Sequence, residues 1–232
     1  MHIPDGFINA GTSLGAGAAS VGGLAVCIRR SRDTLAEKQV PLAGLTAAFV
    51  FAVQMLNFPV AGGTSGHLLG GVLAAVLVGP WVGCLCISVV LVVQALFADG
   101  GLTALGLNIL NMGIVGAIGG YAVFVALRRV LPKTRAGVLI ATAVASWLSV
   151  VLASIAFSIE YAVGGSGGVS ASTVFGAMVG VHALIGIGEA IITTLTVGAV
   201  LATRPDLVYG AADLLPPLEL RTAAPAVAGG AS

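Results

Sequence analysis

The chain has 232 residues, of which 58% are hydrophobic and only 8% are charged, and its mean hydropathy is +1.09. Soluble domains carry about 25% charged residues, so this composition excludes a soluble enzyme and predicts an all-α, polytopic membrane helix bundle. The 34 glycines are typical of membrane helices that pack closely through small residues. A net charge of +1 gives no indication of a nucleic-acid partner.

Hydrophobic stretches define the expected architecture in chain order. We expect seven transmembrane helices, at residues 7–28, 40–56, 67–78, 81–97, 102–127, 136–158 and 174–202. The third is short and ends at Gly79-Pro80. Residues 1–203 then form one membrane domain. Residues 204–232 are rich in Pro and Ala and are expected to be a disordered cytoplasmic tail.

The basic residues follow alternate spans. They are Arg29, Arg30, Arg32, Lys38, Arg128, Arg129, Lys133, Arg135, Arg204 and Arg221. With seven spans and an outside amino terminus, every one of them lies on the cytoplasmic side, as the positive-inside rule requires. Six or eight spans would scatter them. The amino terminus and the loop at residues 57–67 are therefore expected on the same outer face.

The dipeptide Met1-His2 can act as a chelator if the terminal amine is free. The amine nitrogen, the backbone nitrogen of His2 and its imidazole close fused chelate rings when a metal displaces their protons. His is bulky, and initiator Met is normally removed only before small residues, so retention of Met1 is expected. Met-His at a terminus is most often chance, so this dipeptide needs support from elsewhere in the chain.

That support comes from the loop that runs from Asn57 to His67. His67 can supply a fourth nitrogen, and four nitrogens in a plane suit Ni(II) or Cu(II), while imidazole also suits cobalt. We therefore predict a transition-metal site formed by Met1, His2 and His67 at the outer face.

Other polar residues lie within or beside the spans, where they are costly and face the bundle interior. Candidates for orienting the site, or for purely structural hydrogen bonds, are Asn57, Thr64, Ser65, Asn108, Asn111, His182 and Glu189. His182 and Glu189 share one face of the last span and allow a deeper metal station, a proton-linked pair or a structural link; we favour the structural link. Asp5 and Asp99 are expected to cap helices, and Cys84-x-Cys86 to be ordinary packing.

Several motifs are missing. The chain has no phosphate-binding loop of the form G-x-x-x-x-G-K-[ST], no H-E-x-x-H and no convincing Ser/His/Asp set. It is therefore expected to be neither an ATPase nor another enzyme, and no cofactor is expected. A tight metal binder without an energy source cannot release its metal inward repeatedly, so partner subunits are implied.

The chain resembles the cobalt/nickel permease family (CbiM/NikM), the substrate-binding S components of energy-coupling factor transporters. The resemblance rests on residues 1–7 (MHIPDGF), 54–59 (QMLNFP), 62–71 (GGTSGHLLGG), 97–106 (FADGGLTALG) and 182–190 (HALIGIGEA). It runs from residue 1 to about 200 and leaves the tail uncovered.

The resemblance implies a seven-helix S component in the inner (plasma) membrane of a prokaryote. Its ligands map onto Met1, His2 and His67, and its cargo is Co(II) or Ni(II). It also implies a transmembrane T component, two cytoplasmic ATPase subunits and in some cases a small accessory membrane protein. We favour cobalt, for cobalamin synthesis. The alternatives are a stand-alone metal channel or secondary carrier, which would not need the ATPases, and an intramembrane enzyme.

Overall fold

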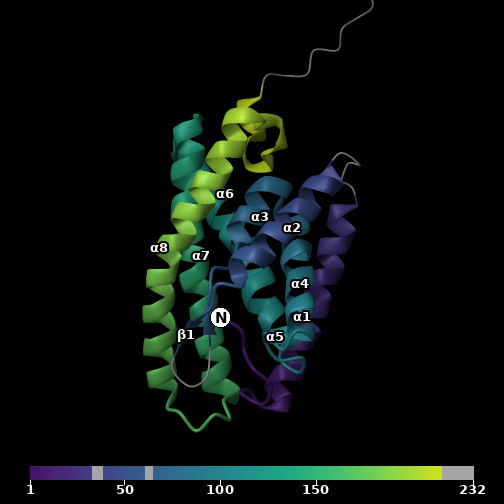
Figure 1. Ribbon diagram of the computed structural model, residues 1–232, viewed down its shortest axis with the longest axis vertical. Helices are drawn as coiled ribbons and strands as arrows, with labels where there is room; N and C mark the ends of the chain where they lie inside the picture. The colour runs from purple at the N-terminus through teal and green to yellow at the C-terminus, as the bar shows by residue number, and fades with distance from the viewer. Residues whose placement is uncertain (33–38, 61–64, 216–232) are drawn as a thin grey trace, which may run out of the picture.

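A computed structural model describes residues 1–32, 39–60 and 65–215, and it is an elongated bundle of helices (Figure 1). Its helices are α1 (Ala10–Ser31), α2 (Val40–Gln54), α3 (Gly71–Val78), α4 (Pro80–Leu96), α5 (Leu105–Asn108), the π-helix η3 (Ile109–Gly119), α6 (Gly120–Val130), α7 (Arg135–Gly164), α8 (Ala171–Thr203) and the 3₁₀ helices η4 (Pro205–Leu207) and η5 (Tyr209–Leu214). Two short antiparallel strands, β1 (Phe58–Pro59) and β2 (Ser65–Gly66), pair between α2 and α3. The predicted all-α class is confirmed.

Local sequence signals set where the helices begin. Asn9, Thr134 and Ser170 cap α1, α7 and α8, and each side chain accepts a hydrogen bond from the backbone N–H three residues later. Gly79 separates α3 from α4 with a φ of +90°, a region that favours glycine. Pro80 then begins α4, where its missing N–H costs nothing.

Residues 105–130 form one continuous rod of α5, η3 and α6. The central π-helix packs its backbone directly against α3: a methyl group built on Gly71 would lie 2.8 Å from the carbonyl carbon of Gly116. Glycine at this crossing allows the two helices to approach at backbone distance. This contact holds the start of α3 in the middle of the bundle.

In the part of the chain that the structure describes, four helical segments are long and apolar enough to cross a membrane: residues 10–31, 105–130, 135–164 and 171–203. α2 and α4 are shorter apolar helices. Each of the seven predicted stretches contains a helix, but the third is only partly helical. α3 has eight residues and so extends about 12 Å, too short to span a hydrocarbon core of about 30 Å. The chain reaches α3 through residues 67–70, which belong to no helix or strand.

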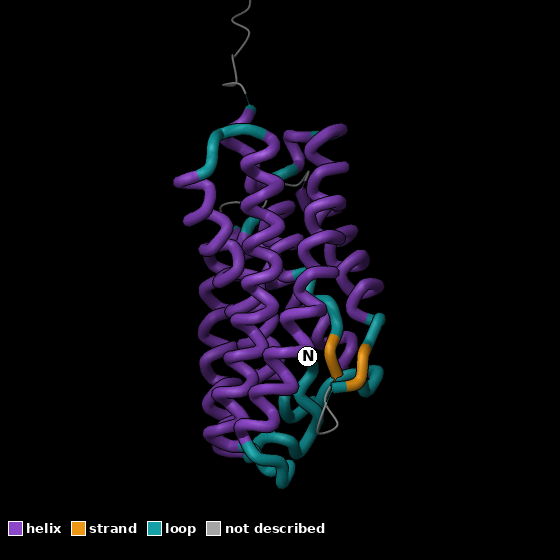
Figure 2. The backbone as a smooth tube through the Cα atoms, turned by 90° about the vertical axis from the view of Figure 1, so that its left-hand side faces the viewer, coloured by secondary structure: helices purple, strands orange, loops and turns teal. Residues whose placement is uncertain are grey.

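The amino-terminal segment runs inward beside the α7–α8 connection. The N–H of Asn9 donates to the Gly164 carbonyl at 2.7 Å, and the N–H of Ser166 donates to the Phe7 carbonyl at 3.0 Å. From there residues 6–1 turn into the bundle, and the terminus lies next to β1 and β2 in both views (Figures 1 and 2).

At the opposite end of the bundle, η4 and η5 fold back onto the helices. Arg128 donates to the Asp213 carboxylate at 2.8 Å, and Val208 and Ala211 are buried. Ordered chain therefore continues to residue 215, beyond the tail boundary predicted at 204. Residues 216–232 lie outside the described part, as do the linker at 33–38 and Thr64.

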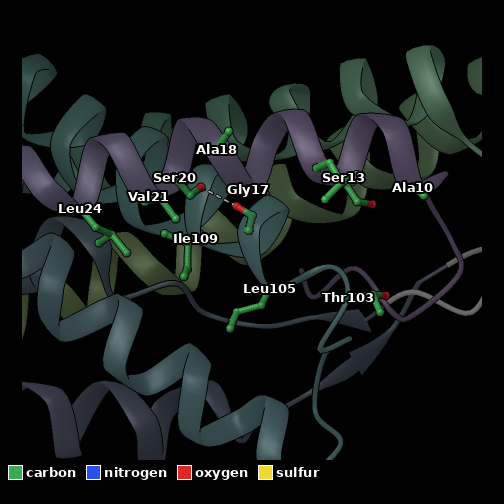
Figure 3. A pocket seen from close by; sticks show the side chains of 12 residues that line it. Ala10, Ser13, Gly17, Ala18, Ser20, Val21, Leu24, Thr103, Leu105 and Ile109 are labelled. Atoms are coloured by element: carbon green, nitrogen blue, oxygen red, sulfur yellow. Dashed lines mark hydrogen bonds between the residues drawn. The ribbon is translucent and has the colours of Figure 1, made fainter.

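A groove of about 730 Å³ lies between α1 and the α5–η3 rod. Small and apolar side chains line it, and the Ser20 hydroxyl, which lies in its wall, donates to the Gly106 carbonyl at 2.6 Å (Figure 3). This groove lies on the outside of the helix bundle, and Met1, His2 and His67 do not line it.

Candidate metal centre

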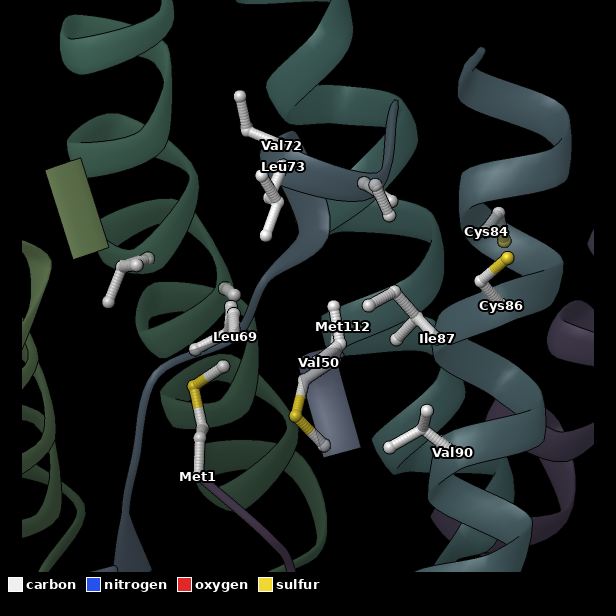
Figure 4. Close-up of a cluster of buried hydrophobic side chains, with 14 of the residues drawn as sticks. Met1, Val50, Leu69, Val72, Leu73, Cys84, Cys86, Ile87, Val90 and Met112 are labelled. Carbon is white, nitrogen blue, oxygen red and sulfur yellow. The ribbon is translucent and has the colours of Figure 1, made fainter. Parts of the chain in front are cut away.

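The Met1 side chain is an apolar anchor for the terminus. Met1 is fully buried, and its side chain lies beside Leu69 among residues of several helices (Figure 4). A buried methionine side chain contributes roughly 1.5–3 kcal/mol relative to an exposed one. The first residue of the chain is thus held in the core, together with its amine.

Hydrogen bonds on Ile3 fix the backbone just after His2. The Ile3 N–H donates to Asn108 Oδ1 at 2.8 Å, and Asn108 Nδ2 donates to the Ile3 carbonyl at 3.2 Å. The Gly101 N–H donates to the same carbonyl at 2.9 Å. Asp5 accepts from the N–H and the hydroxyl of Thr103. Asn108 therefore holds the backbone next to His2.

The His2 ring is buried and held at one nitrogen. Nε2 lies 3.1 Å from Gln94 Oε1, an atom that only accepts, so Nε2 carries the proton in this contact. Nδ1 lies 3.2 Å from Asp99 Oδ1, at ion-pair distance from this carboxylate. This leaves Nδ1, the ring nitrogen nearer the backbone, as the one that a terminal chelate would use.

His67 follows β2 and is fully buried. Its Nδ1 donates to the Leu68 carbonyl at 2.7 Å, and its Nε2 has no hydrogen-bond partner. The His67 ring stacks on the His2 ring with centroids 4.3 Å apart and planes 26° apart. The structure therefore brings His67 next to Met1 and His2, which lie more than sixty residues earlier in the sequence.

Glu189 of α8 binds the backbone of the segment that follows His67. The Glu189 carboxylate accepts hydrogen bonds from the backbone N–H groups of Leu69 and Gly70 at 2.8 and 2.7 Å. Gln54 donates to the Leu69 carbonyl at 2.6 Å. A carboxylate at the start of α3 also complements the helix dipole. Glu189 thus binds backbone groups and not His182, so the link between these two side chains that was favoured from the sequence is not formed.

His182 of α8 repeats the arrangement of His67. It is fully buried, its Nδ1 donates to the Met178 carbonyl at 2.8 Å, and its Nε2 has no hydrogen-bond partner. The ring is close enough to the terminal amine and to His67 to interact electrostatically with both.

Burial keeps the terminal nitrogen bases neutral. It lowers the pKa of the Met1 amine well below its ordinary value, although the Asp99 carboxylate opposes this. Burial also lowers the pKa of His2, again against the effect of Asp99. The contact with His2 in turn lowers the pKa of Asp99. Free-base nitrogens next to a carboxylate are the form that a divalent cation binds.

Among the described residues, no group of three or more His, Cys, Asp or Glu side chains is placed to hold a metal ion. A site here therefore depends on main-chain nitrogen: the amine and the His2 amide would join His2 Nδ1 and His67 Nε2. Such a four-nitrogen set is suited to Ni(II) or Cu(II), and its imidazoles also suit cobalt.

The other sequence candidates have varied positions. Asn57 is exposed and donates to Asp99 at 3.3 Å, so it touches a residue that contacts His2. Ser65 lies in β2, next to the His67 segment. Asn111 donates to Glu160 of α7 at 2.7 Å, away from the histidines. Thr64 falls outside the described residues.

Two residues in contact with His2 were not among the predicted site residues. Gln94 lies within α4, and Asp99 was expected to cap a helix. Asp99 instead lies beside His2, in the Gly-rich turn after α4. The signal available in the sequence was a carboxylate expected on the same outer face as His2.

The fold and this buried nitrogen-rich centre define a multi-pass membrane protein with the features of a transition-metal transporter. A solved transition metal transporter superposes with a TM-score of 0.80 and 31% identity, covering 87% of this chain and 99% of its own. The model of the CbiM family, described as a cobalt uptake substrate-specific transmembrane region, matches residues 2–207. The chain belongs to this family of cobalt and nickel transport proteins.

Some relatives are named as nickel transport proteins and others as cobalt transport proteins. A putative fused nickel transport protein of Archaeoglobus fulgidus is 41% identical over 209 residues, covering 90% of this chain and 68% of its own length. A cobalt transport protein of Sorangium cellulosum is 33% identical, covering 89% of this chain and 94% of its own. A putative metal transport protein of Haloquadratum walsbyi is 37% identical, covering 90% and 94%.

Proposed function

We propose that this chain is the substrate-binding membrane subunit of an energy-coupling factor importer, which captures Co(II) or Ni(II) at the outer face and delivers it to the cytoplasm. The observation that carries the proposal is the buried amino terminus. The His2 ring stacks on the His67 ring, and neither His2 Nδ1 nor His67 Nε2 has a hydrogen-bond partner. Met1, His2 and His67 are the proposed ligands.

Release of the cargo needs no new group on the protein. The His2 amide nitrogen recovers its proton, His2 Nδ1 returns to Asp99, and the metal leaves without a change of oxidation state. The terminal segment is held by contacts with the α4–α5 turn and with Asn108 of α5. A shift of that turn would therefore open the chelate, and we assign the driving force to partner subunits.

The partners proposed are a transmembrane T component and two cytoplasmic ATPases, with a small accessory membrane protein where one is present. Three glycines support contact with another membrane subunit, because methyl groups built on Gly15, Gly176 and Gly180 would meet no atom within 4 Å. These glycines leave parts of α1 and α8 unpacked within this chain.

The proposed orientation places the amino terminus outside and the carboxyl terminus inside, with seven helical passes in the inner membrane of a prokaryote. The basic residues support it. Arg30 lies over Trp81 at the start of α4, and Arg128 binds Asp213 of η5. Both arginines lie at the end of the bundle that is remote from Met1, as the positive-inside rule expects for the cytoplasmic side.

We propose Co(II) as the physiological cargo, for cobalamin synthesis, with Ni(II) bound by the same nitrogens. The cobalt description of the matching family supports this choice. The test of function is uptake of labelled Co(II) and Ni(II) into cells that express the chain with its partners. A variant ATPase unable to hydrolyse ATP should abolish accumulation. Accumulation that persists would contradict the importer and support a stand-alone channel or carrier.

A further inference from the structure

His182 is a buried imidazole that the proposed four-nitrogen grip does not use. It has no exposed surface, and its Nδ1 proton is committed to the Met178 carbonyl. Its Nε2 therefore keeps a lone pair, and this atom is buried without a hydrogen-bond partner. An unpaired buried polar atom destabilises the fold, so packing alone does not favour a histidine here.

The same arrangement is found in histidines that bind metals. Such residues donate one ring N–H to a carbonyl or carboxylate, which fixes the tautomer and points the other nitrogen at the metal. His67 does so through Leu68, and His182 does so through Met178. The two histidines thus present equivalent Nε2 atoms from different elements of the fold.

The His182 ring edge faces the residue that precedes His67. A methyl group built on Gly66 would lie 3.5 Å from His182 Cε1, the ring carbon bonded to both nitrogens. The ring also interacts electrostatically with His67 and with the terminal amine. The same methyl group would lie closer still to Ile185 Cδ1 and Val60 Cγ2, at 2.6 and 3.1 Å, so glycine at position 66 allows the His67 segment to pack closely against α8.

His182 also lies deeper along the bundle than the start of its helix. Counting from Ala171 at 1.5 Å per residue, it lies about 16 Å along α8. The residues of the terminal chelate enter from the end where α8 begins. A ligand at His182 therefore lies inside the bundle, next to the segment that carries His67.

We propose that His182 Nε2 is a transit ligand, which takes the metal from the amino-terminal chelate while His67 remains bound. This inference rests on the proposed function and adds a second station to it. In the exchange, the bonds from the metal to the amine and to the His2 nitrogens break and a bond to His182 Nε2 forms. The His2 amide takes a proton from water, and the oxidation state of the metal does not change.

A pair of imidazoles binds a divalent metal more weakly than four nitrogens joined by chelate rings, because two ligands supply fewer bonds and no ring closure. The second station is therefore masked in equilibrium titrations of the wild-type chain. It becomes visible when the terminal chelate is disabled by one extra Ala between Met1 and His2, which leaves His67 and His182 unchanged in sequence.

The test substitution is His182→Gln, which has a similar volume and keeps an N–H that can donate to the Met178 carbonyl, but lacks a nitrogen lone pair. Thr194→Val is the matched control, since it removes another buried, unpartnered polar atom of α8. Ni(II) titrations of the full-length chain compare both substitutions in the wild-type and insertion backgrounds. Cu(II) electron paramagnetic resonance then counts the coupled imidazole nitrogens.

In the insertion background we expect a residual Ni(II) site that His182→Gln weakens at least tenfold, with loss of one coupled imidazole, while Thr194→Val changes neither. Residual affinity and imidazole count that are insensitive to His182→Gln would overturn the proposal. Failure of the wild-type chain to bind Ni(II) tightly would instead overturn the proposed function.

A second measurement covers the case in which the inserted chain does not fold. In the otherwise wild-type chain, His182→Gln should leave Ni(II) affinity and thermal unfolding unchanged but lower energised uptake at least tenfold. Uptake at the wild-type rate would remove the transit role.

Discussion

At the scale of single residues, three imidazoles each commit one nitrogen and leave the other free. His2 contacts Gln94 through Nε2, whereas His67 and His182 donate through Nδ1 to backbone carbonyls. The free atoms of all three are buried without hydrogen bonds. Each contact fixes which nitrogen keeps its lone pair, and so prepares a ligand set before metal arrives.

The substitution His67→Ala tests the proposed fourth ligand. Loss of an orienting partner alone lowers metal affinity about 10–100-fold, so loss of a ligand should lower Ni(II) affinity by at least about 100-fold. Isothermal titration of the purified chain measures this. Thr46→Val, which removes a buried and unpartnered hydroxyl on α2, should bind like wild type. Wild-type affinity in His67→Ala would exclude His67 as a ligand.

The lowered pKa values predict how affinity depends on pH. Because burial lowers the pKa of the amine and of His2, neither carries a proton in the folded chain near neutral pH. Only the His2 amide then releases a proton on binding, so affinity should change about tenfold per pH unit between pH 8 and 6.5. Below that range the dependence should become steeper, as His2 takes up a proton.

An amine with an ordinary pKa would give a different pH dependence of affinity. If the amine kept its ordinary pKa near 8.0, affinity would change about a hundredfold per pH unit in the same window. The linkage for stability has a matching sign. The unfolded amine takes up a proton as pH falls below its ordinary pKa and the buried amine does not, so the metal-free fold should lose stability on acidification.

At the scale of elements, contacts with other parts of the fold determine where α3 begins. Its eight residues are all buried, and its first turn lies against the backbone of η3. Glu189 of α8 supplies the acceptors for the N–H groups of Leu69 and Gly70. The position of His67, two residues before Leu69, therefore depends on a carboxylate that is far away in sequence.

The substitution Glu189→Gln should destabilise this element. The glutamate accepts two charge-assisted hydrogen bonds, each worth about 1.5–3 kcal/mol. A glutamine can accept only one of them, because its amide nitrogen is a donor and would face the other backbone N–H. We expect the unfolding free energy to fall by about 2–4 kcal/mol and Ni(II) affinity to fall with it. Thermal unfolding in detergent measures the first effect, with Thr194→Val as control. An unchanged midpoint would show that Glu189 does not support the loop.

The helices could be predicted because long apolar runs, and the caps at Asn9 and Ser170, are local signals. The short length of α3 could not, since residues 67–69 continue into an apolar run but form no helix, and Gln54 and Glu189 bind the backbone of Leu69. The contact of Asp99 with His2 was missed for the same reason. It is made by two turns that meet only in the folded chain.

At the scale of the whole molecule, the proposed orientation makes opposite ends of the bundle accessible from opposite sides of the membrane. The three native cysteines are buried, so introduced cysteines report on their own positions. Ser172→Cys, near the start of α8, should react with a membrane-impermeant maleimide in intact cells. Lys133→Cys should react only after permeabilisation. Both residues are exposed, and the reverse pattern would invert the topology.

The central claim is that the amino terminus itself binds the metal. The most direct measurement is a Ni(II) and Co(II) titration of the purified chain beside a variant with one extra Ala between Met1 and His2. The insertion retains every side chain but lengthens the terminal chelate and displaces the imidazole from the amine. Our account predicts that affinity for both ions collapses. Unchanged affinity would contradict it and would make the terminus a bystander.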